Sequence, residues 1–298
     1  MAADAGVLVM AYGTPATPAD VEAYYTHVRR GRPPTPELLA ELRARYDAIG
    51  GTSPLLERTR AQAAGLAAAL GDGYRVELGM KHAAPFIEDG VAALVAAGVG
   101  SMVGLVLAPH YSRLSVGEYG GRARAAADEA GVPLAMVESW HVEAGYVDLL
   151  AGFVRDGLAG LPDGAEVVFT AHSLPARILA DGDHYPAQLE ETAAAVAERA
   201  GVGDWSVGWQ SAGRTPEPWI GPDVLDVLRA RARDGSAGVL VCPAGFVSDH
   251  LEVLYDLDVE AARLAADLGL PFARTRMPND HPLFCSTLAD VVRERRGG

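Results

Sequence analysis

The sequence predicts an α/β protein made of two similar domains, each a four-stranded parallel sheet flanked by helices, with a cleft between them. Short apolar runs rich in β-branched residues alternate with longer amphipathic or Ala-rich segments, which is typical of buried parallel strands joined by helices. Eight such runs divide into four and four around a break near residues 139–145. Residues 106–112 and 168–175 share one further feature, an apolar strand that ends on His and Ser. We therefore predict duplicated α/β units that face each other.

The predicted elements alternate along the whole chain. We expect strands at residues 7–12, 74–80, 101–108, 134–138, 166–171, 205–210, 238–243 and 272–277. We expect helices at residues 18–28, 36–48, 54–70, 85–97, 116–130, 143–158, 186–199, 222–233, 250–268 and 282–295. Several of these helices begin with Pro, which the first turn tolerates because its N–H groups have no partner within the helix.

The break between the two groups of strands gives the predicted domain boundaries. Residues 1–142 form the N-terminal domain and residues 143–281 the C-terminal domain, and the last helix, 282–298, is expected to pack back on the N-terminal domain. Ligands of open α/β sheets bind beyond the carboxyl ends of the strands. Here those ends carry polar and imidazole side chains, namely Tyr12, His82, His110, His172 and Gln210.

The composition describes a globular protein and argues against two kinds of partner. Hydrophobic residues make up 49% of the 298 residues, which is enough for a large core. A net charge of −14 argues against nucleic acid, because phosphates require a basic surface. No apolar run approaches the roughly 20 residues of a membrane span, and residues 1–6 lack the layout of a signal peptide. We expect a cytoplasmic protein with no membrane partner.

Several cofactor and catalytic motifs are missing. Cys242 and Cys285 stand far apart, which argues against a disulfide scaffold, a zinc ribbon or a four-thiolate iron–sulfur cluster. Lys81 is the only lysine, so a Walker A phosphate loop is excluded. The glycines of residues 98–104 have the wrong spacing for a dinucleotide fingerprint, and no GxSxG elbow of a serine hydrolase is present. We expect no nucleotide cofactor.

The helix predicted at residues 250–268 carries an acidic stripe. Glu252, Asp256 and Glu260 recur at steps of four, so they share one helix face at intervals of roughly 6 Å along the axis. Such carboxylates repel each other, and no Lys or Arg lies between Asp249 and Glu260. A divalent cation would relieve the repulsion. A solvated acidic face is the alternative.

A histidine can complete such a cation site. His172 ends the fifth predicted strand and Glu252 follows the strand at 238–243, so both can face one cleft. An imidazole and a carboxylate suit a borderline divalent ion such as Fe²⁺, and two protein ligands hold it weakly. A weak site is what an enzyme needs if it gives the metal away. The alternative for His172 is a hydrogen-bonded structural role.

A basic cluster stands out in this acidic chain. Its members are Arg29, Arg30, Arg32, Arg43 and Arg45. The planar fork of an Arg guanidinium matches a carboxylate in a bidentate manner, so the cluster indicates a small anionic ligand. Cations that complement the dipole of a helix C-terminus are the alternative.

Eight segments resemble the ferrochelatase family in their order and spacing. They are MAYGTP (10–15), YTHVRRGR (25–32), RYDAIGGTSP (45–54), LAPH (107–110), AHSLP (171–175), GWQS (208–211), WIGPD (219–223) and GFVSDHLEVLYD (245–256). One such motif is weak evidence, whereas eight in sequence cover nearly the whole chain. The resemblance implies two Rossmann-like, chelatase-type domains and a lyase that inserts Fe²⁺, its substrate, into a porphyrin with release of two protons. Within the family the chain is most similar to the bacterial enzymes of Gram-positive type, which act on coproporphyrin III.

The resemblance also implies roles for individual residues. His172 and Glu252 are the expected catalytic pair, which faces the pyrrole nitrogens on one side of the macrocycle. Tyr12 approaches from the other side as an axial ligand of the metallated product. The porphyrin carboxylates and rim are expected to contact Arg29, Arg45, Tyr46, Ser53 and Tyr119. Coproporphyrin carries four carboxylates, which gives the Arg cluster a purpose.

Metallation requires a bent ring, because a planar porphyrin hides its nitrogen lone pairs. We hypothesise that His172 accepts a pyrrole proton. Glu252, Asp256 and Glu260 would then carry protons out or metal in, so these four residues are the metal-binding candidates.

Alternatives remain at two rim positions and for the function. Ser53 can simply cap the helix that begins at Pro54, and Tyr119 can be an ordinary half-buried helix residue. Another tetrapyrrole chelatase, acting on protoporphyrin IX or inserting Co²⁺ or Ni²⁺, is an alternative, as is a non-catalytic haem- or porphyrin-binding protein. The latter would not need the pair His172 and Glu252.

The resemblance carries two further expectations. Family members with a [2Fe–2S] cluster use four cysteines, so no cluster is expected here. Residues 14–36 are polar and basic rather than a hydrophobic lip, so a soluble monomer is expected. The sequence does not indicate the iron donor or the enzyme that receives the haem.

Overall fold

Two parallel sheets with the same strand order form the framework of this computed structural model, which describes residues 4–213 and 215–297. The N-terminal sheet has the order β2-β1-β3-β4 and consists of β1 (Ala5–Ala11), β2 (Tyr74–Met80), β3 (Met102–Val106) and β4 (Leu134–Val137). The C-terminal sheet has the order β6-β5-β7-β8 and consists of β5 (Glu166–His172), β6 (Trp205–Gln210), β7 (Val239–Cys242) and β8 (Phe272–Arg274). All neighbouring strands pair in parallel, so the predicted fold of two similar four-stranded α/β units is confirmed.

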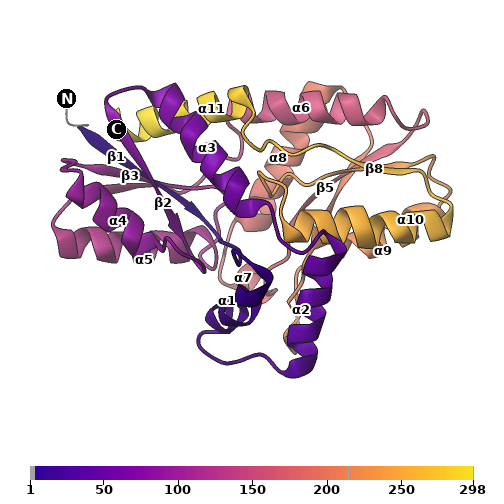
Figure 1. Cartoon of the computed structure of the whole chain (residues 1–298). Helices are drawn as coiled ribbons and strands as arrows, with labels where there is room; N and C mark the ends of the chain where they lie inside the picture. Colours follow the sequence, from indigo (N-terminus) through magenta and orange to yellow (C-terminus); the bar gives the residue numbers. More distant parts are fainter. Residues whose placement is uncertain (1–3, 214, 298) are drawn as a thin grey trace.

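Helices connect the strands and cover both faces of each sheet (Figure 1). They are α1 (Val21–Val28), α2 (Pro36–Ala48), α3 (Leu55–Leu70), α4 (Ile87–Ala96), α5 (Val116–Ala130), α6 (Ala144–Leu158), α7 (Arg177–Ala180), α8 (Tyr185–Ala200), α9 (Val224–Arg233), α10 (Ala262–Leu268) and α11 (Pro282–Gly297). A 3-10 turn, η1 (Pro18–Asp20), precedes α1, and a π-helix, η2 (Val253–Ala261), precedes α10. Each predicted helix is present within a few residues. The short α7 was not predicted, because four residues carry no hydrophobic repeat.

Alternate residues of the central strands enter different cores, as the two-residue period of a strand requires. In β1, Val7 and Val9 belong to one buried cluster, whereas Leu8 and Met10 belong to a second cluster with α4 and α5. In β5, Phe169 joins the first cluster and Val168 joins a third, with α9, η2 and α10. Both sheets are therefore buried on both faces, which explains their continuous apolar runs.

The first cluster extends across both sheets and includes side chains of α3, α6, α8 and α11. Helix α11 packs against α3 and α6 and against strands β3 and β4. One apolar cluster thus joins the two units. The domain boundary at residue 142 and the assignment of residues 282–298 to the N-terminal domain therefore stay predictions.

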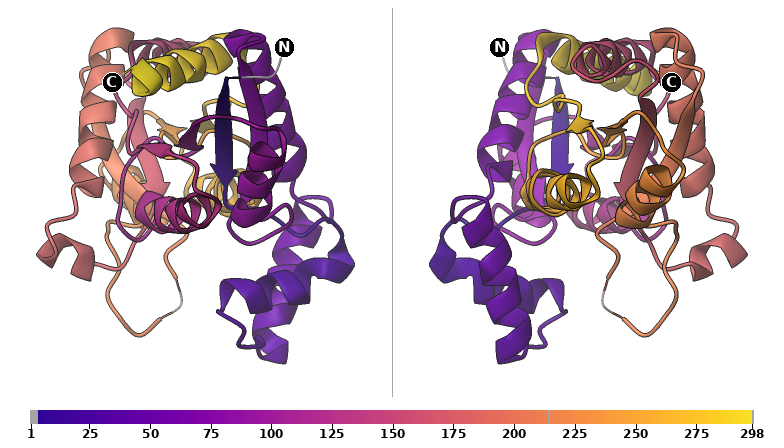
Figure 2. Two further views of the ribbon diagram at one scale, coloured as in Figure 1. Left: turned by 90° about the vertical axis from the view of Figure 1, so that its left-hand side faces the viewer. Right: turned by 90° about the vertical axis from the view of Figure 1, so that its right-hand side faces the viewer.

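Two arms extend from the same end of the molecule (Figure 2). Helices α1 and α2 form one arm, and α7 with the loop after β6 forms the other. The first arm is anchored by a small cluster of Val21, Leu39 and Tyr46, against which Leu251 packs. No helix among the described residues has the length and apolarity to cross a membrane.

Gly245 lets the segment after β7 lie directly on the end of β5. Its backbone N–H donates to the carbonyl of Thr170 at 2.9 Å. A Cβ atom at Gly245 would lie 2.4 Å from Cβ and 2.7 Å from Cα of Ala171, closer than any side chain tolerates. This contact brings the segment that carries Glu252 next to His172.

We predict that Gly245→Ala lowers the free energy of unfolding by about 1–3 kcal/mol, because the added methyl overpacks against the backbone of β5. Urea denaturation measures this change. Gly152→Ala in α6 is the matched control: nothing lies within 4 Å of the added methyl. Its expected effect is a gain of about 0.5–1 kcal/mol from helix propensity. Equal effects of the two substitutions would contradict the close approach.

Candidate active site

The carboxyl ends of both sheets meet at a cleft of about 440 Å³. Tyr12 and Lys81 follow β1 and β2, His172 ends β5, and the segment after β7 contributes Glu252. Aromatic side chains form much of the remaining wall, namely Tyr24, Tyr25, Tyr46, Tyr119, Tyr185, Trp219 and Phe246. A cleft with flat apolar walls and few charged groups suits a planar aromatic ligand.

His172 and Glu252 meet in this cleft, as predicted. Nε2 of His172 lies 3.6 Å from Oε1 of Glu252, and Nε2 of His250 lies 3.5 Å from its Oε2. Nδ1 of His172 donates to the carbonyl of Ser173, and Nδ1 of His250 donates to the carbonyl of Ser248 at 3.1 Å. These backbone bonds fix both rings with Nε2 toward the carboxylate.

The contact between His172 and Glu252 changes the pKa of both groups. Desolvation lowers the pKa of His172, but the charge and hydrogen bond of Glu252 outweigh it and raise the pKa to about 9. Desolvation acts to raise the pKa of Glu252, but the charges of His172 and His250 hold it below its ordinary value. At neutral pH the pair is therefore an imidazolium, protonated on both ring nitrogens, and a carboxylate that holds no proton.

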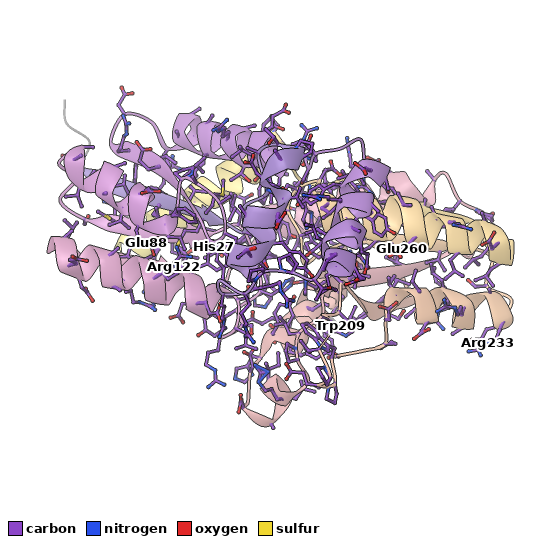
Figure 3. The ribbon with its side chains drawn as sticks, turned by 60° about the horizontal axis from the view of Figure 1, so that its bottom comes forward. His27, Glu88, Arg122, Trp209, Arg233 and Glu260 are labelled. Carbon is purple, nitrogen blue, oxygen red and sulfur yellow. The ribbon has the colours of Figure 1, made fainter. Side chains whose placement is uncertain are left out.

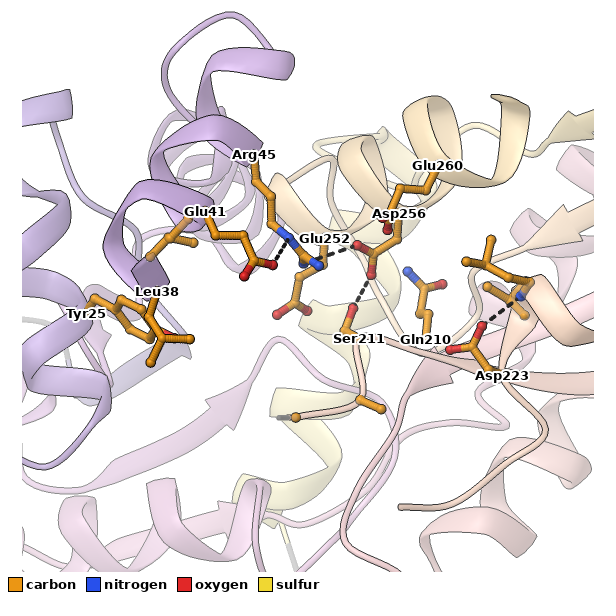
Figure 4. A pocket seen from close by; sticks show the side chains of 15 residues that line it. Tyr25, Leu38, Glu41, Arg45, Gln210, Ser211, Asp223, Glu252, Asp256 and Glu260 are labelled. Carbon is orange, nitrogen blue, oxygen red and sulfur yellow. Dashed lines mark hydrogen bonds and ion pairs between the residues drawn. The ribbon is translucent and has the colours of Figure 1, made fainter. Parts of the chain in front are cut away.

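A second cavity, of about 370 Å³, adjoins the cleft and is acidic (Figure 4). Glu252 lines both cavities, and the second also contains Glu41, Arg45, Asp256 and Glu260. Nη1 of Arg45 lies 3.7 Å from Oδ1 of Asp256, and its Nε lies 3.9 Å from Oε1 of Glu41. The guanidinium also lies over the ring of Tyr255, 4.8 Å from its centroid.

Asp256 is the deepest carboxylate of this cavity. Its Oδ2 accepts a hydrogen bond from the hydroxyl of Ser211, which follows β6 with a φ of 59°, a left-handed conformation uncommon outside glycine. Desolvation, helped by the charges of Glu252 and Glu260, raises the pKa of Asp256 to about 6, although Ser211 and Arg45 oppose the change. Asp256 therefore titrates close to neutral pH.

The structure changes two expectations about the acidic stripe. The helix expected at 250–268 contains the π-helix η2, whose i→i+5 hydrogen bonds give a wider turn, although its three acidic side chains still line one cavity. Positive charge comes from Arg45 on α2 and from the imidazolium of His172, so a metal cation is not required to relieve the repulsion. Among the described residues no three His, Cys, Asp or Glu side chains gather as a metal site. The metal role of the stripe stays a prediction.

The predicted rim residues fall into different places. Tyr12, Tyr46, Ser53 and Tyr119 line the cleft. Arg45 lines the acidic cavity instead, where its side chain pairs with carboxylates.

Arg29 is absent from the described linings of both cavities. Its Nε donates to the carbonyl of Arg32 at 3.3 Å, and its guanidinium lies 5.7 Å from the ring centroid of Tyr25. Arg29 caps α1 and Arg45 lies in the last turn of α2, so both positions also fit the helix-dipole alternative.

The alternatives for Ser53 and Tyr119 have different outcomes. Oγ of Ser53 accepts from the N–H of Leu55 at 3.3 Å, so Ser53 caps the start of α3 while it lines the cleft. Tyr119 is 5% exposed, so it is more deeply buried than an ordinary half-buried helix residue.

Sequence reasoning missed His250 and Lys81 as cleft residues. His250 stands two positions before Glu252, a spacing that would place it on a different face of an ordinary helix. It contacts Glu252 because it lies in the irregular segment directly before the helix. Lys81 follows β2, so its place at a strand end was a usable signal.

Solved chelatase structures share this fold. The sirohydrochlorin chelatase of Bacillus subtilis subspecies spizizenii, solved with cobalt, has a TM-score of 0.61 at 14% identity, with 98% of this chain and 95% of that chain covered. CbiX, a siroheme-biosynthesis enzyme of denitrifying bacteria, has a TM-score of 0.57 at 14% identity, with 97% and 98% covered. The fold is therefore that of the chelatases, with two similar α/β units.

Sequence comparison gives the family. Residues 4–296 match the ferrochelatase family model. The coproporphyrin III ferrochelatase of Anoxybacillus flavithermus is 48% identical over 298 residues, covering 96% of this chain and 95% of that protein. The coproporphyrin III ferrochelatase of Bacillus subtilis strain 168 is 45% identical over 303 residues, covering 98% of each. The chain belongs to the ferrochelatase family, and the resemblance carried by the eight motifs is confirmed.

We predict that Glu252→Gln lowers the pKa of His172 from about 9 toward its ordinary value, because desolvation is then no longer opposed by the charge and hydrogen bond of Glu252. NMR titration of the imidazole measures this pKa. Glu260→Gln is the matched control, because Glu260 does not contribute to the pKa of His172, and should leave it unchanged. A pKa near 6.5 in the unaltered protein would contradict the pairing.

The same pair predicts a pH dependence of stability. The pKa of His172 in the folded protein is raised above its ordinary value of 6.5. The stabilisation of the fold by protonated His172 is therefore complete below pH 6.5 and is lost as the pH rises through about 9. The free energy of unfolding should fall over this range in the unaltered protein and fall less in Glu252→Gln. Urea denaturation at several pH values measures the difference, and identical curves would contradict it.

Proposed function

We propose that the protein is a coproporphyrin III ferrochelatase, which inserts Fe²⁺ into that porphyrin and releases two protons. The observation that carries the proposal is the contact of His172 with Glu252 inside a cleft walled by aromatic side chains. Nε2 of His172 lies 3.6 Å from Oε1 of Glu252. Relatives that are 44–48% identical along the full chain carry this activity in their names, which supports the choice of porphyrin.

Proton balance limits what the pair can do. Fe²⁺ replaces two pyrrole protons, and both protons have to leave through groups that can accept them. His172 already holds a proton on Nε2 at neutral pH, so the carboxylate of Glu252 is the first free acceptor. His172 becomes a base once it passes its own proton to Glu252. His172 can therefore accept a pyrrole proton only after this transfer.

The acidic cavity offers a route away from the porphyrin. Glu252 lines both cavities, and Asp256 and Glu260 continue along the second. A carboxyl group with a pKa of about 6, such as that of Asp256, takes up and releases protons readily near neutral pH. We propose that His172, Glu252, Asp256 and Glu260 contact the incoming iron or carry the outgoing protons.

The cleft wall supplies the remaining contacts of the proposed substrate complex. Tyr12 projects into the cleft with 42% of its surface exposed, which suits an axial approach to the metallated product. Tyr46, Ser53 and Tyr119 offer hydroxyls to the porphyrin rim. Arg29 and Arg45 stay proposed carboxylate partners, and Arg45 has to exchange Asp256 for the substrate.

The finer expectations complete the proposal. Fe²⁺ is a substrate rather than a resident cofactor, and we expect no iron–sulfur cluster, no nucleotide cofactor, and neither nucleic acid nor membrane as a partner. We expect a cytoplasmic monomer. Its iron donor and the enzyme that accepts its haem are not indicated by any residue of the chain.

An anaerobic metallation assay tests the function. The protein at catalytic concentration, mixed with Fe²⁺ and coproporphyrin III, is expected to remove the free-base absorption bands over many turnovers, and more slowly with protoporphyrin IX. A change that stops at one equivalent would instead indicate a porphyrin-binding protein. Faster turnover of protoporphyrin IX would overturn the choice of substrate.

Removing the imidazole tests the catalytic pair. We predict that His172→Ala lowers kcat about 10²- to 10⁴-fold, because a positioned proton-transfer group contributes that much. His184→Ala is the matched control, since His184 is an exposed residue before α8, and should leave kcat unchanged. If His172→Ala turns over within about threefold of the unaltered protein, the assignment is wrong.

A further inference from the structure

Lys81 places a lysine ammonium in the wall of the cleft. It is the only lysine in the sequence. Among the described residues that line the cleft, it is also the only Lys or Arg. Its side chain is 13% exposed, so its charge acts inside the cleft rather than on the outer surface.

The backbone of Lys81 is held at both ends. Its N–H donates to the carbonyl of Ala11, the last residue of β1, at 2.9 Å. Its carbonyl accepts a hydrogen bond from Nη1 of Arg122 at 2.7 Å. Arg122 is in turn fixed by Glu88, with 2.6 Å between Nη2 and Oε2, and Figure 3 shows these two side chains side by side. The ammonium therefore extends from a rigid base.

The ammonium has a carboxylate partner within the protein. Nζ of Lys81 lies 2.5 Å from Oε2 of Glu118 and 5.2 Å from the ring centroid of Tyr119. The side chain of Glu118 is 37% exposed, and its other oxygen lies 3.6 Å from the exposed guanidinium of Arg30. An ammonium has three donors, so it can take a second carboxylate or exchange one for another.

The arginines expected to hold carboxylates are engaged elsewhere in this structure. Arg45 pairs with Asp256 in the acidic cavity, and Arg29 contacts Arg32 and Tyr25. Lys81, unlike these two arginines, already lines the cleft, so a porphyrin in the cleft can reach it without any rearrangement of helices α1 and α2.

We propose that Lys81 binds a carboxylate of the porphyrin substrate and that Glu118 occupies its place when the cleft is empty. This inference rests on the proposed function. Glu118 keeps the buried ammonium paired when the cleft is empty. An uncharged substituent cannot displace Glu118, because it offers the ammonium no negative charge in exchange. The pair thereby selects a porphyrin that carries a carboxylate at this position.

Three variants test the proposal by metallation kinetics and by quenching of coproporphyrin III fluorescence. Lys81→Met is expected to raise KM and Kd about tenfold with kcat within about threefold, as loss of one charged hydrogen bond predicts. Glu118→Gln is expected to lower both constants about threefold, because the competing carboxylate is gone. The double variant is expected to stay more than threefold above the unaltered protein.

The double variant separates binding from a structural role. If Lys81 only neutralises Glu118, removal of both charges restores KM and Kd to within threefold of the unaltered protein, and the inference is overturned. A rise in KM for Glu118→Gln alone also overturns it, even if Lys81→Met does not fold. Lys81→Arg should recover most of the binding.

Two controls isolate this test from other failures. Arg229→Met removes one positive charge from α9, where Arg229 pairs with Asp226 at 2.7 Å away from both cavity linings, and should leave KM unchanged. Absence of turnover by the unaltered protein would reject the proposed function. Turnover with an unchanged KM in Lys81→Met would reject only the role of Lys81.

Discussion

Glu252 is the carboxylate on which the arrangement of the site depends. It lies between the imidazoles of His172 and His250 and forms part of the wall of both cavities. Its position follows from the backbone, because β7 lies beside β5 and Gly245 permits the next segment to touch the end of β5. One close approach between two chain segments therefore sets the charge state of the pair, and with it the order in which protons can move.

The fold was largely predictable because its signals are local. Apolar β-branched runs marked all eight strands, and the repeated group of four indicated two equivalent sheets. The π-helix η2 was not predictable, because a hydrophobic pattern that fits a period of 3.6 residues does not exclude a wider turn. The carboxylate of Asp256 in η2 is held by Arg45 and Ser211, which come from distant parts of the chain.

The site was predictable where it depends on strand ends and not where it depends on ion pairs between elements. The order of strands along the sequence alone predicts that His172 and Glu252 face one cleft. Arg45 was expected to bind the substrate and Asp256 to bind a metal. In the structure these two side chains form an ion pair with each other instead. Such contacts are set by the docking of α2 on η2, for which the sequence carries no period or motif.

The position of α11 has a consequence for synthesis on the ribosome. Buried side chains of this last helix, including Phe284, Leu288 and Val292, cover the same apolar cluster as Val7 near the start of the chain. The apolar face of the N-terminal sheet that carries Val7 is therefore only partly covered until α11 has been synthesised. Loss of α11 would expose this apolar surface and leave the first half of the polypeptide prone to aggregation, although it would remove none of the residues of the cleft.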